Sequence, residues 1–446
     1  MIKVTKNICF AIAIGVSLLT AGAAKAGDKE CLIIDDKCPI ECKDFKICDI
    51  FDKTTLYKNE ENCLIQSVKF QGRYHGQYEH IDVDGPRYAD GDYWRHRRFR
   101  VGTKIVFLND FTFSTNWNIG GSDGFGTNAN NNHDTFNSIE DMSITWKPSD
   151  LDPLVSIQVG KVKNKIMREE SVSSNSIKTL ERSHFVNTYN AQRPWGAEVG
   201  LKLGGLKHYF GLWSNSFDQE VQPVPGGNAF RNDAGQNWAR WDHGVIGTYR
   251  TSYEFNDCTE AHFNYMYTDV SSYGDIANAG DIEAGGSAEH IFSLGTVTES
   301  GRFELLTDLL FAANVDNTPG RSGAGQGNEN PFGEKDAWGV VILPSYKLGC
   351  CERLEIVGRY QYGSFVNDED PYDNVDNKVG NTNNSDWMKD LHGFYAGLNY
   401  YICGDNLKVM AGVEYLTGES VDAANIAAGA ADYDATAFSF AVRSKW

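Results

Sequence analysis

The sequence predicts an all-β protein: a 16-stranded antiparallel transmembrane β-barrel with short periplasmic turns and long extracellular loops. Three observations predict it. Segments of about ten residues alternate apolar and polar side chains, which fits strands that cross a membrane. The links between them are short and long in strict turn, and the last segment ends on an aromatic residue.

Composition excludes several other classes of protein. The 446 residues contain 24 Phe, 21 Tyr and 10 Trp, which is too aromatic for a disordered chain. Only one apolar run approaches the roughly 20 residues of a membrane helix, so a polytopic helical membrane protein is excluded. The net charge of -19 argues against nucleic acid as a partner.

The apolar run at the amino terminus predicts a secretory signal over residues 1–26. Lys3 and Lys6 precede an apolar core, and Ala24-Lys25-Ala26 offers small residues for cleavage. A membrane-anchoring helix is the alternative, although the core is short for one. Removing the segment takes away three lysines and no acid, so the charge changes from -19 to -22.

Residues 27–62 do not fit the barrel pattern and are predicted to form a cysteine-rich periplasmic segment. Exported chains meet oxidising conditions, so disulfides are expected. The candidates, counted with the cysteines of the barrel turns, are Cys31, Cys38, Cys42, Cys48, Cys63, Cys258, Cys350, Cys351 and Cys403. Two interpretations stay open: a disulfide-stapled plug or collar, and cross-links between subunits or to other envelope proteins.

Residues 63–446 carry the repeated alternation of the barrel. Val68, Phe70, Gly72, Tyr74, Gly76 and Tyr78 fall on one face of the first segment, and the residues between them, all polar, fall on the other. The same period of two recurs in about 16 segments, each predicted to be a strand with one apolar face.

The links between the segments predict the topology. Short links lie at 108–110, 147–153, 204–205, 255–259, 299–301, 348–352 and 403–405, and long polar links lie between them. This strict alternation is typical of an up-and-down barrel with both termini on the turn side. A closed sheet also satisfies every backbone group in lipid, which offers no hydrogen-bond partner. A secreted β-sandwich or a solenoid is the alternative.

The final segment provides an independent signal. Phe438, Phe440 and Val442 alternate outward, and the chain stops on Trp446. Outer-membrane barrels commonly end in this way, so we assign Phe440 and Trp446 to the assembly signal.

The inward faces predict a cationic lumen. Alternation places twelve bases and seven acids inside, an excess of about five positive charges in an acidic protein. A barrel of 16 strands is wide enough for an aqueous channel, and a cationic wall raises the local concentration of anions. The alternative is that these bases only pair with inward acids across the strands.

The link at 161–193 is the one basic link among acidic ones. It follows the fifth strand, and its position and charge predict a constriction loop that folds into the lumen. An external loop that contacts lipopolysaccharide phosphates is the alternative.

Three stretches resemble the phosphate-selective porins of the O and P type. They are Arg97-Arg98-Phe99-Arg100-Val101-Gly102, the run from Gly160-Lys161 through Ser173-Ser174-Asn175 to Leu180-Glu181-Arg182-Ser183, and Arg193-Pro194-Trp195-Gly196. The resemblance implies a homotrimer of 16-stranded barrels in the outer membrane that takes up phosphate or other small anions. Acidic loops and many cysteines depart from the family pattern.

Pattern and resemblance together give a set of expected anion-binding residues in the pore. They are Arg73, Arg98, Arg100, Lys104, Lys161, Lys163, Lys165, Arg168, Arg182 and Arg193. The partners expected are outer-membrane lipid, small anions and disulfide-linked envelope proteins, with no nucleic acid.

Two further hypotheses complete the sequence analysis. A structural envelope protein, cross-linked by disulfides and with secondary pore activity, is the alternative function. An enzyme is not expected, because no Gly-x-Ser-x-Gly occurs and the histidines show no pairing suited to catalysis. We expect no cofactor and no dedicated metal site, although Asp368-Glu369-Asp370 keeps a loop calcium ion open as an alternative.

Overall fold

In the computed structural model, residues 45–84, 91–119, 136–189, 193–214, 245–268, 288–315, 335–367, 387–420 and 432–446 are described. The expected signal at 1–26, the cysteines before Cys48 and the acidic run at 368–370 lie outside these ranges. None of the described helices is long and apolar enough to cross a membrane.

Most of the described chain is strand, with a few short helices. In chain order the elements are η1 (Lys46–Cys48), α2 (Asp49–Asp52), β1 (Thr55–Lys58), β2 (Ile65–Asp84), β3 (Gly91–Phe107), β4 (Phe111–Ile119), β5 (Phe136–Trp146), β6 (Leu154–Lys161), α3 (Arg168–Ser171), α4 (His184–Tyr189), β7 (Trp195–Leu203), β8 (Leu206–Ser214), β9 (Val245–Asn256), β10 (Thr259–Thr268), β11 (Ala288–Ser300), β12 (Phe303–Val315), β13 (Lys335–Leu348), β14 (Leu354–Asn367), β15 (Trp387–Tyr401), β16 (Leu407–Ser420) and β17 (Asp432–Lys445).

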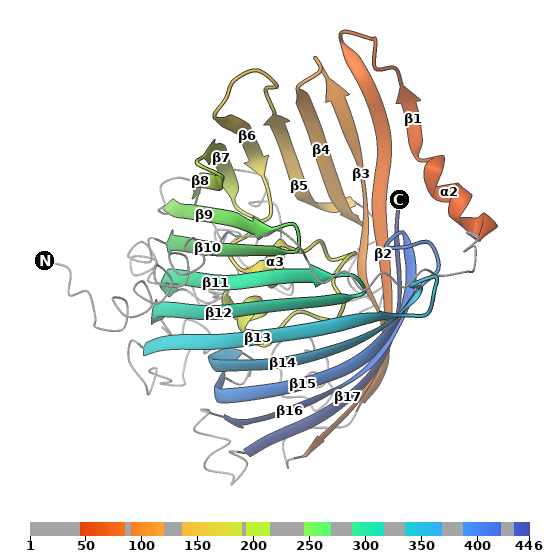
Figure 1. Ribbon diagram of the computed structural model, residues 1–446. Coiled ribbons are helices and arrows are strands. Elements are labelled where there is room, and N and C mark those ends of the chain that lie inside the picture. Colours follow the sequence, from red (N-terminus) through yellow and green to blue (C-terminus); the bar gives the residue numbers. More distant parts are fainter. Residues whose placement is uncertain are drawn as a thin grey trace, which may run out of the picture.

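Strands β2–β17 form a closed antiparallel barrel (Figure 1). Each strand pairs with its neighbour in sequence, and β17 returns to pair with β2 from Asp434↔Asp84 to Lys445↔Arg73. The predicted 16-stranded barrel is confirmed. Closure leaves no edge among these strands, so every strand finds hydrogen-bond partners on both sides.

Burial separates the two faces of the wall as the alternation predicts. Outward Phe394 and Phe438 are each 50% exposed, as expected for side chains that contact lipid, whereas inward Lys408 and Arg443 are 0% and 1% exposed. The apolar face of each strand therefore faces outward, and the polar residues are buried inside the barrel.

The predicted alternation of short turns and long loops is confirmed as well. The turns between β3 and β4, β7 and β8, β13 and β14, and the other hairpins of this end lie where the short links were expected. Glycines with positive φ occupy several of them, including Gly204 at +57° and Gly404 at +54°, a backbone conformation that favours residues without a Cβ.

Two β-bulges alter the parity that sequence periodicity implies. On β3, His75 of β2 pairs with Arg98 and Gly76 pairs with His96, so Arg97 is the extra residue. On β5, Glu140 is extra in the same way. A bulge sets two adjacent side chains toward one face. As a result Arg97 joins Arg98, and Glu140 joins Asp141, inside the barrel.

The segment before the barrel adds to the sheet, although residues 27–62 showed no strand pattern. β1 pairs with the start of β2, at Thr55↔Lys69 and Tyr57↔Val68. It continues the line of β17, because the Gly72 N–H donates to the Trp446 carbonyl and the Phe70 N–H donates to the Thr54 carbonyl. Figure 1 shows α2 and β1 beside the end of β2 where the carboxyl terminus lies.

A disulfide fixes the amino-terminal segment to the turn end of the barrel. Cys48 is bonded to Cys403, in the turn between β15 and β16. Cys258, Cys350 and Cys351, all in turns at the same end, are disulfide-bonded too. Among the described cysteines, Cys63 alone is a free thiol, and it is exposed.

Residues 161–189 of the link at 161–193, called loop 161–193 below, lie inside the barrel, as Figure 1 shows for α3. Its apolar side chains, among them Ile166, Phe185 and Tyr189, form one buried cluster with inward residues of β9–β14. The inward residues of this cluster on β9–β14 include Ile246, Met266, Ile291, Leu306, Leu310, Val341 and Val357. Burial of this apolar surface holds the loop against that part of the wall and leaves the turn ends of β2, β3 and β17 with polar inward residues.

Candidate functional site

Inward bases of β14, β16 and β17 bind the backbone of loop 161–193. Arg359 donates to the Glu181 carbonyl at 2.7 Å, Lys408 donates to the Ile177 carbonyl at 3.0 Å, and Arg443 donates to the carbonyls of Ser174 and Leu180. Arg359 also forms ion pairs with Glu414 and with Glu169 of the loop. These bases therefore hold the loop in the lumen.

Most of the remaining lumen bases are paired with acids. Arg100 contacts Glu140 at 2.7 Å, and Arg193 contacts both Glu140 and Asp141. The other pairs join Arg97 to Glu181, Lys163 and Arg182 to Glu170, Lys178 to Glu304 and Glu355, and Arg250 to Glu198. The interpretation that inward bases pair with acids thus holds for much of the lumen.

Two loop bases show what this pairing does to their protonation. Burial lowers the pKa of Lys163 well below that of an ordinary lysine, because Glu170 at 3.0 Å offsets it only in part and Arg182 shares the same carboxylate. Burial also works against the charge of Arg193, but Glu140 and Asp141 raise its pKa above the usual value. Arg193 is therefore held as a cation between the loop and β5.

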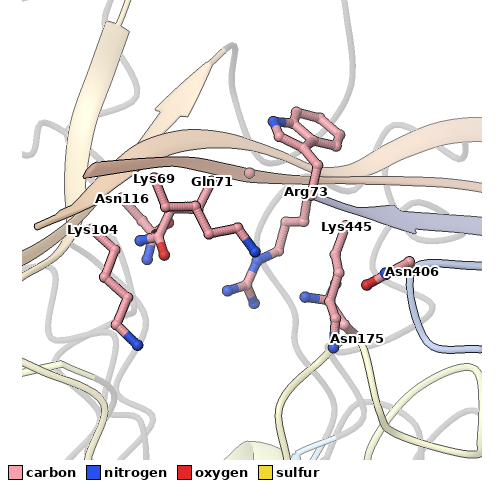
Figure 2. Close-up of a pocket in the computed structure, with 10 residues that line it drawn as sticks. Lys69, Gln71, Arg73, Lys104, Asn116, Asn175, Asn406 and Lys445 are labelled. Atoms are coloured by element: carbon pink, nitrogen blue, oxygen red, sulfur yellow. Dashed lines mark hydrogen bonds between the residues drawn. The ribbon is translucent and has the colours of Figure 1, made fainter. Parts of the chain in front are cut away.

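A basic pocket of about 250 Å³ lies at the turn end of the lumen. Its lining comprises Lys69, Gln71, Gly72, Arg73, Lys104, Asn116, Asn175, Asn406, Lys445 and Trp446. Four of these side chains are bases and none is an acid. Figure 2 shows Arg73, Lys104 and Lys445 pointing to the same side of the sheet, with Asn175 of the loop beside them.

The four bases come together because the barrel closes on itself. Lys69 and Arg73 are on β2, and Lys104 is directly opposite Lys69 on β3. Lys445 is opposite Arg73, from β17 on the other side of β2. Within the described residues none of the four forms an ion pair. The acids closest in effect are Asp141 and Glu140, which act on Arg73 without forming an ion pair with it.

The loop closes the inner side of this pocket. Arg73 donates to the Ser174 hydroxyl at 2.7 Å, and buried His75 is 2.8 Å from the Asn175 side-chain oxygen. Next to them, Nη1 of Arg98 is buried without a hydrogen-bond partner in the described part of the chain. Cationic side chains without an ion pair therefore line this space, and an anion is the ligand that such a lining satisfies.

Sequence comparison covers part of the chain that builds this site, without Asn406, Lys445 and Trp446. Residues 68–233 match the family profile "Phosphate-selective porin O and P", which includes β2, β3 and loop 161–193. The resemblance to the phosphate-selective porins is confirmed over these residues. No match among curated proteins was found.

Solved structures of outer-membrane channels share the fold. The outer membrane channel DcaP of Acinetobacter baumannii aligns with a TM-score of 0.51 and 11% identity, over 88% of this chain and all of that one. An anion-selective porin from Comamonas acidovorans gives 0.50 and 12%, over 85% and 99%. OmpF of Salmonella typhi gives 0.51 and 13%, over 87% and 99%. The porin fold and the profile match point to a channel in the outer membrane rather than to an enzyme.

Of the ten residues expected to bind anions, four are free of ion pairs within the described ranges and six are engaged in structural contacts. Arg73 and Lys104 line the basic pocket, Arg98 lies next to it, and Lys165 is exposed without an ion pair among described residues. The other six are engaged in contacts that hold the loop or the wall: Arg100, Lys161, Lys163, Arg168, Arg182 and Arg193. Lys161, for example, is 3% exposed and donates to the Ile139 carbonyl.

Sequence reasoning missed the amides of the pocket and undervalued two lysines. Lys69 and Lys445 carry the alternation that marks inward bases, but their proximity depends on the pairing of β17 with β2. In a closed barrel the first and last strands are neighbours, so the proximity of these two lysines could have been predicted from the sequence. Asn116 and Asn406 have no distinguishing pattern. Within the described ranges, no group of three or more His, Cys, Asp or Glu side chains is placed to hold a metal.

Proposed function

We propose that this chain is a passive outer-membrane channel for small hydrophilic solutes that prefers anions, phosphate among them. The observation that carries the proposal is the basic pocket, where Lys69, Arg73, Lys104 and Lys445 meet no acidic side chain. Many other bases of the described lumen are paired with acids, so this pocket is a place where four bases without an ion pair come together.

The chemistry of the pocket supports anion binding in two ways. Arg73 presents a planar fork that matches phosphate oxygens, and the lysines add mobile ammonium groups. The amide of Asn175 adds a neutral N–H donor at the same place, whereas the amides of Gln71 and Asn116 donate to neighbouring strand residues. Since the bases lie at the lumen wall and face water, an anion is attracted without being trapped.

Ion selectivity tests the proposal. Purified protein in a planar bilayer under a salt gradient is expected to give a reversal potential that favours anions. Replacing three pocket lysines, as Lys69→Gln, Lys104→Gln and Lys445→Gln together, is expected to remove most of this preference. Lys389→Gln is the control, because Lys389 is exposed and paired with Glu419 at the other end of the barrel. A wild-type channel that prefers cations contradicts the proposal.

Phosphate recognition needs its own measurement. Inorganic phosphate is expected to reduce chloride current in the wild-type channel at lower concentration than sulfate does. Arg73→Gln is expected to raise the half-blocking phosphate concentration about tenfold, because a charge-assisted hydrogen bond contributes about 1.5–3 kcal/mol. Equal block by both anions leaves an anion channel without phosphate preference.

Processing and assembly complete the proposal. The sequence features of residues 1–26 support removal after Ala26, which amino-terminal sequencing of the mature protein tests. The family resemblance supports a homotrimer, which light scattering of the detergent-solubilised protein tests.

The exposed thiol of Cys63 favours a second candidate function. A disulfide-linked structural protein of the envelope needs a free, accessible cysteine at the periplasmic end, and Cys63 has both properties. Non-reducing electrophoresis of whole envelopes tests this. Bands of higher mass that disappear in Cys63→Ser support it, and migration as a monomer in both cases excludes it.

A further inference from the structure

The amino-terminal segment contacts both walls of the basic pocket. On one wall, Thr55 pairs with Lys69, and the Phe70 N–H donates to the Thr54 carbonyl at 2.9 Å. On the other, Cys48 is bonded to Cys403, three residues before pocket residue Asn406. Residues 48–58, named the strap from here on, therefore bridge β2 to the turn between β15 and β16.

That turn and its two strands also hold the tip of loop 161–193. The Ser176 hydroxyl donates to Asp405 at 2.6 Å, Lys408 donates to the Ile177 carbonyl at 3.0 Å, and the amide of Asn399 donates to the Lys178 carbonyl at 2.9 Å. Three consecutive loop residues are thus bound by one hairpin, and the strap fixes this hairpin covalently.

The residues just before them in the loop form the inner side of the pocket. Ser174 accepts from Arg73, and Asn175 contacts His75 and lines the pocket itself. A continuous series of contacts therefore runs from the strap through Cys403 and Asp405 to the loop tip. Energetic coupling between two parts of a protein is carried by packed or bonded groups that connect them. Bonded groups of this kind connect the strap to the pocket.

We propose that the strap sets the affinity of the basic pocket for anions, with Asp405 as the residue that positions the loop tip. The pocket is assembled from β2, β3, β4, β17, a turn and a loop, so its geometry depends on how these parts are held together. Binding groups that are fixed before the ligand arrives cost less entropy on binding. The inference rests on the proposed anion function and extends it to a segment outside the barrel.

Removing the disulfide is the first test. In the full-length channel, Cys48→Ser combined with Cys403→Ser is expected to raise the half-blocking concentration of inorganic phosphate about three- to tenfold, with the barrel still folded. Cys258→Ser is the matched control, because it removes a disulfide from the turn between β9 and β10, away from the pocket. An unchanged half-blocking concentration overturns the proposal, and so does an equal rise in Cys258→Ser.

A double-mutant cycle is the second test, and it does not depend on the disulfide. Ser176→Ala is expected to raise the half-blocking phosphate concentration about fivefold, the value of one hydrogen bond. Asp405→Ala is expected to raise it at least as much, because Asp405 also forms an ion pair with Lys408 at 3.4 Å. The two changes combined are expected to have no more effect than Asp405→Ala alone, because Ser176→Ala removes a contact that Asp405→Ala has already removed. Additive effects, or no effect of either, overturn the positioning role of Asp405.

The outcome separates this proposal from the proposed function. A wild-type channel without anion preference refutes the function itself. An anion-selective wild type whose phosphate block is the same in all these variants refutes only the role of the strap. Retention of the heat-sensitive mobility of folded barrels in electrophoresis confirms that each variant is folded.

Discussion

At the scale of single residues, most lumen bases of this chain are structural. Arg359 shows why: it is 3% exposed, contacts Glu169 at 3.1 Å and Glu414 at 2.7 Å, and donates to a loop carbonyl. A buried cation held by two acids and a carbonyl is not available to a solute. The pocket lysines differ because none of them forms an ion pair among the described residues.

The buried position of Arg359 leads to a prediction about stability. Arg359→Ala leaves Glu169 and Glu414 buried without their partner and is expected to lower the free energy of unfolding by about 3–5 kcal/mol. Lys389→Ala removes an ion pair whose members are half exposed and is expected to cost less than about 1 kcal/mol. Urea titration of the folded barrel in detergent measures both. Similar values for the two variants contradict the assigned role of Arg359.

At the scale of elements, loop 161–193 owes its position to close packing on the wall. Helix α4 lies against β13 and β14, where Gly339 and Gly363 leave room for Phe185. A Cβ at Gly339 would lie 2.7 Å from Cδ2 of Phe185, which is itself 1% exposed. The glycines therefore form the notch that receives the loop.

This notch gives a prediction for one glycine. Gly339→Ala is expected to displace α4, to destabilise the barrel by about 1–3 kcal/mol and to make single-channel currents noisier. Gly358→Ala, in a neighbouring strand, is the control, because its Cβ would meet nothing closer than 3.6 Å. Planar bilayer recordings compare the two variants. Quiet, wild-type currents in Gly339→Ala would show that α4 does not need the notch.

Sequence periodicity predicted the strands, turns and closure because these depend on local alternation and link length. It could not predict that Arg97 and Glu140 point inward, since a bulge leaves no trace in the alternation of neighbouring residues. The pairing of each base was equally hidden, because it depends on the path of a loop through the lumen. Arg182, for instance, meets Glu170 only because the loop turns back on itself.

At the scale of the whole molecule, the pairing of β2 with β17, called the seam below, both closes the barrel and brings the pocket residues together. Trp446 participates in both, because its backbone exchanges hydrogen bonds with Gly72 and its ring stacks on Phe70 outside the wall. A Cβ on Gly72 would lie 2.6 Å from the Trp446 ring, so this contact needs glycine.

Deletion of Trp446 is therefore expected to reduce assembly. The variant loses a ring that covers the seam and two backbone hydrogen bonds, so the amount of folded protein in the outer membrane is expected to fall severalfold. Phe438→Ala is the control, because Phe438 is an equally outward aromatic in the middle of β17. Fractionation and immunoblotting compare them. Equal levels of the two variants contradict a special role of the last residue.

The alignment of β1 with β17 has a practical consequence for handling the protein. A continuation of β17 along β2 would meet Thr54, whose carbonyl already accepts from the Phe70 N–H. An affinity tag fused to the carboxyl end would have to compete with β1 for that place. Epitopes and labels are better inserted in the long loops at the opposite end of the barrel, where the pairing of the two termini is left undisturbed.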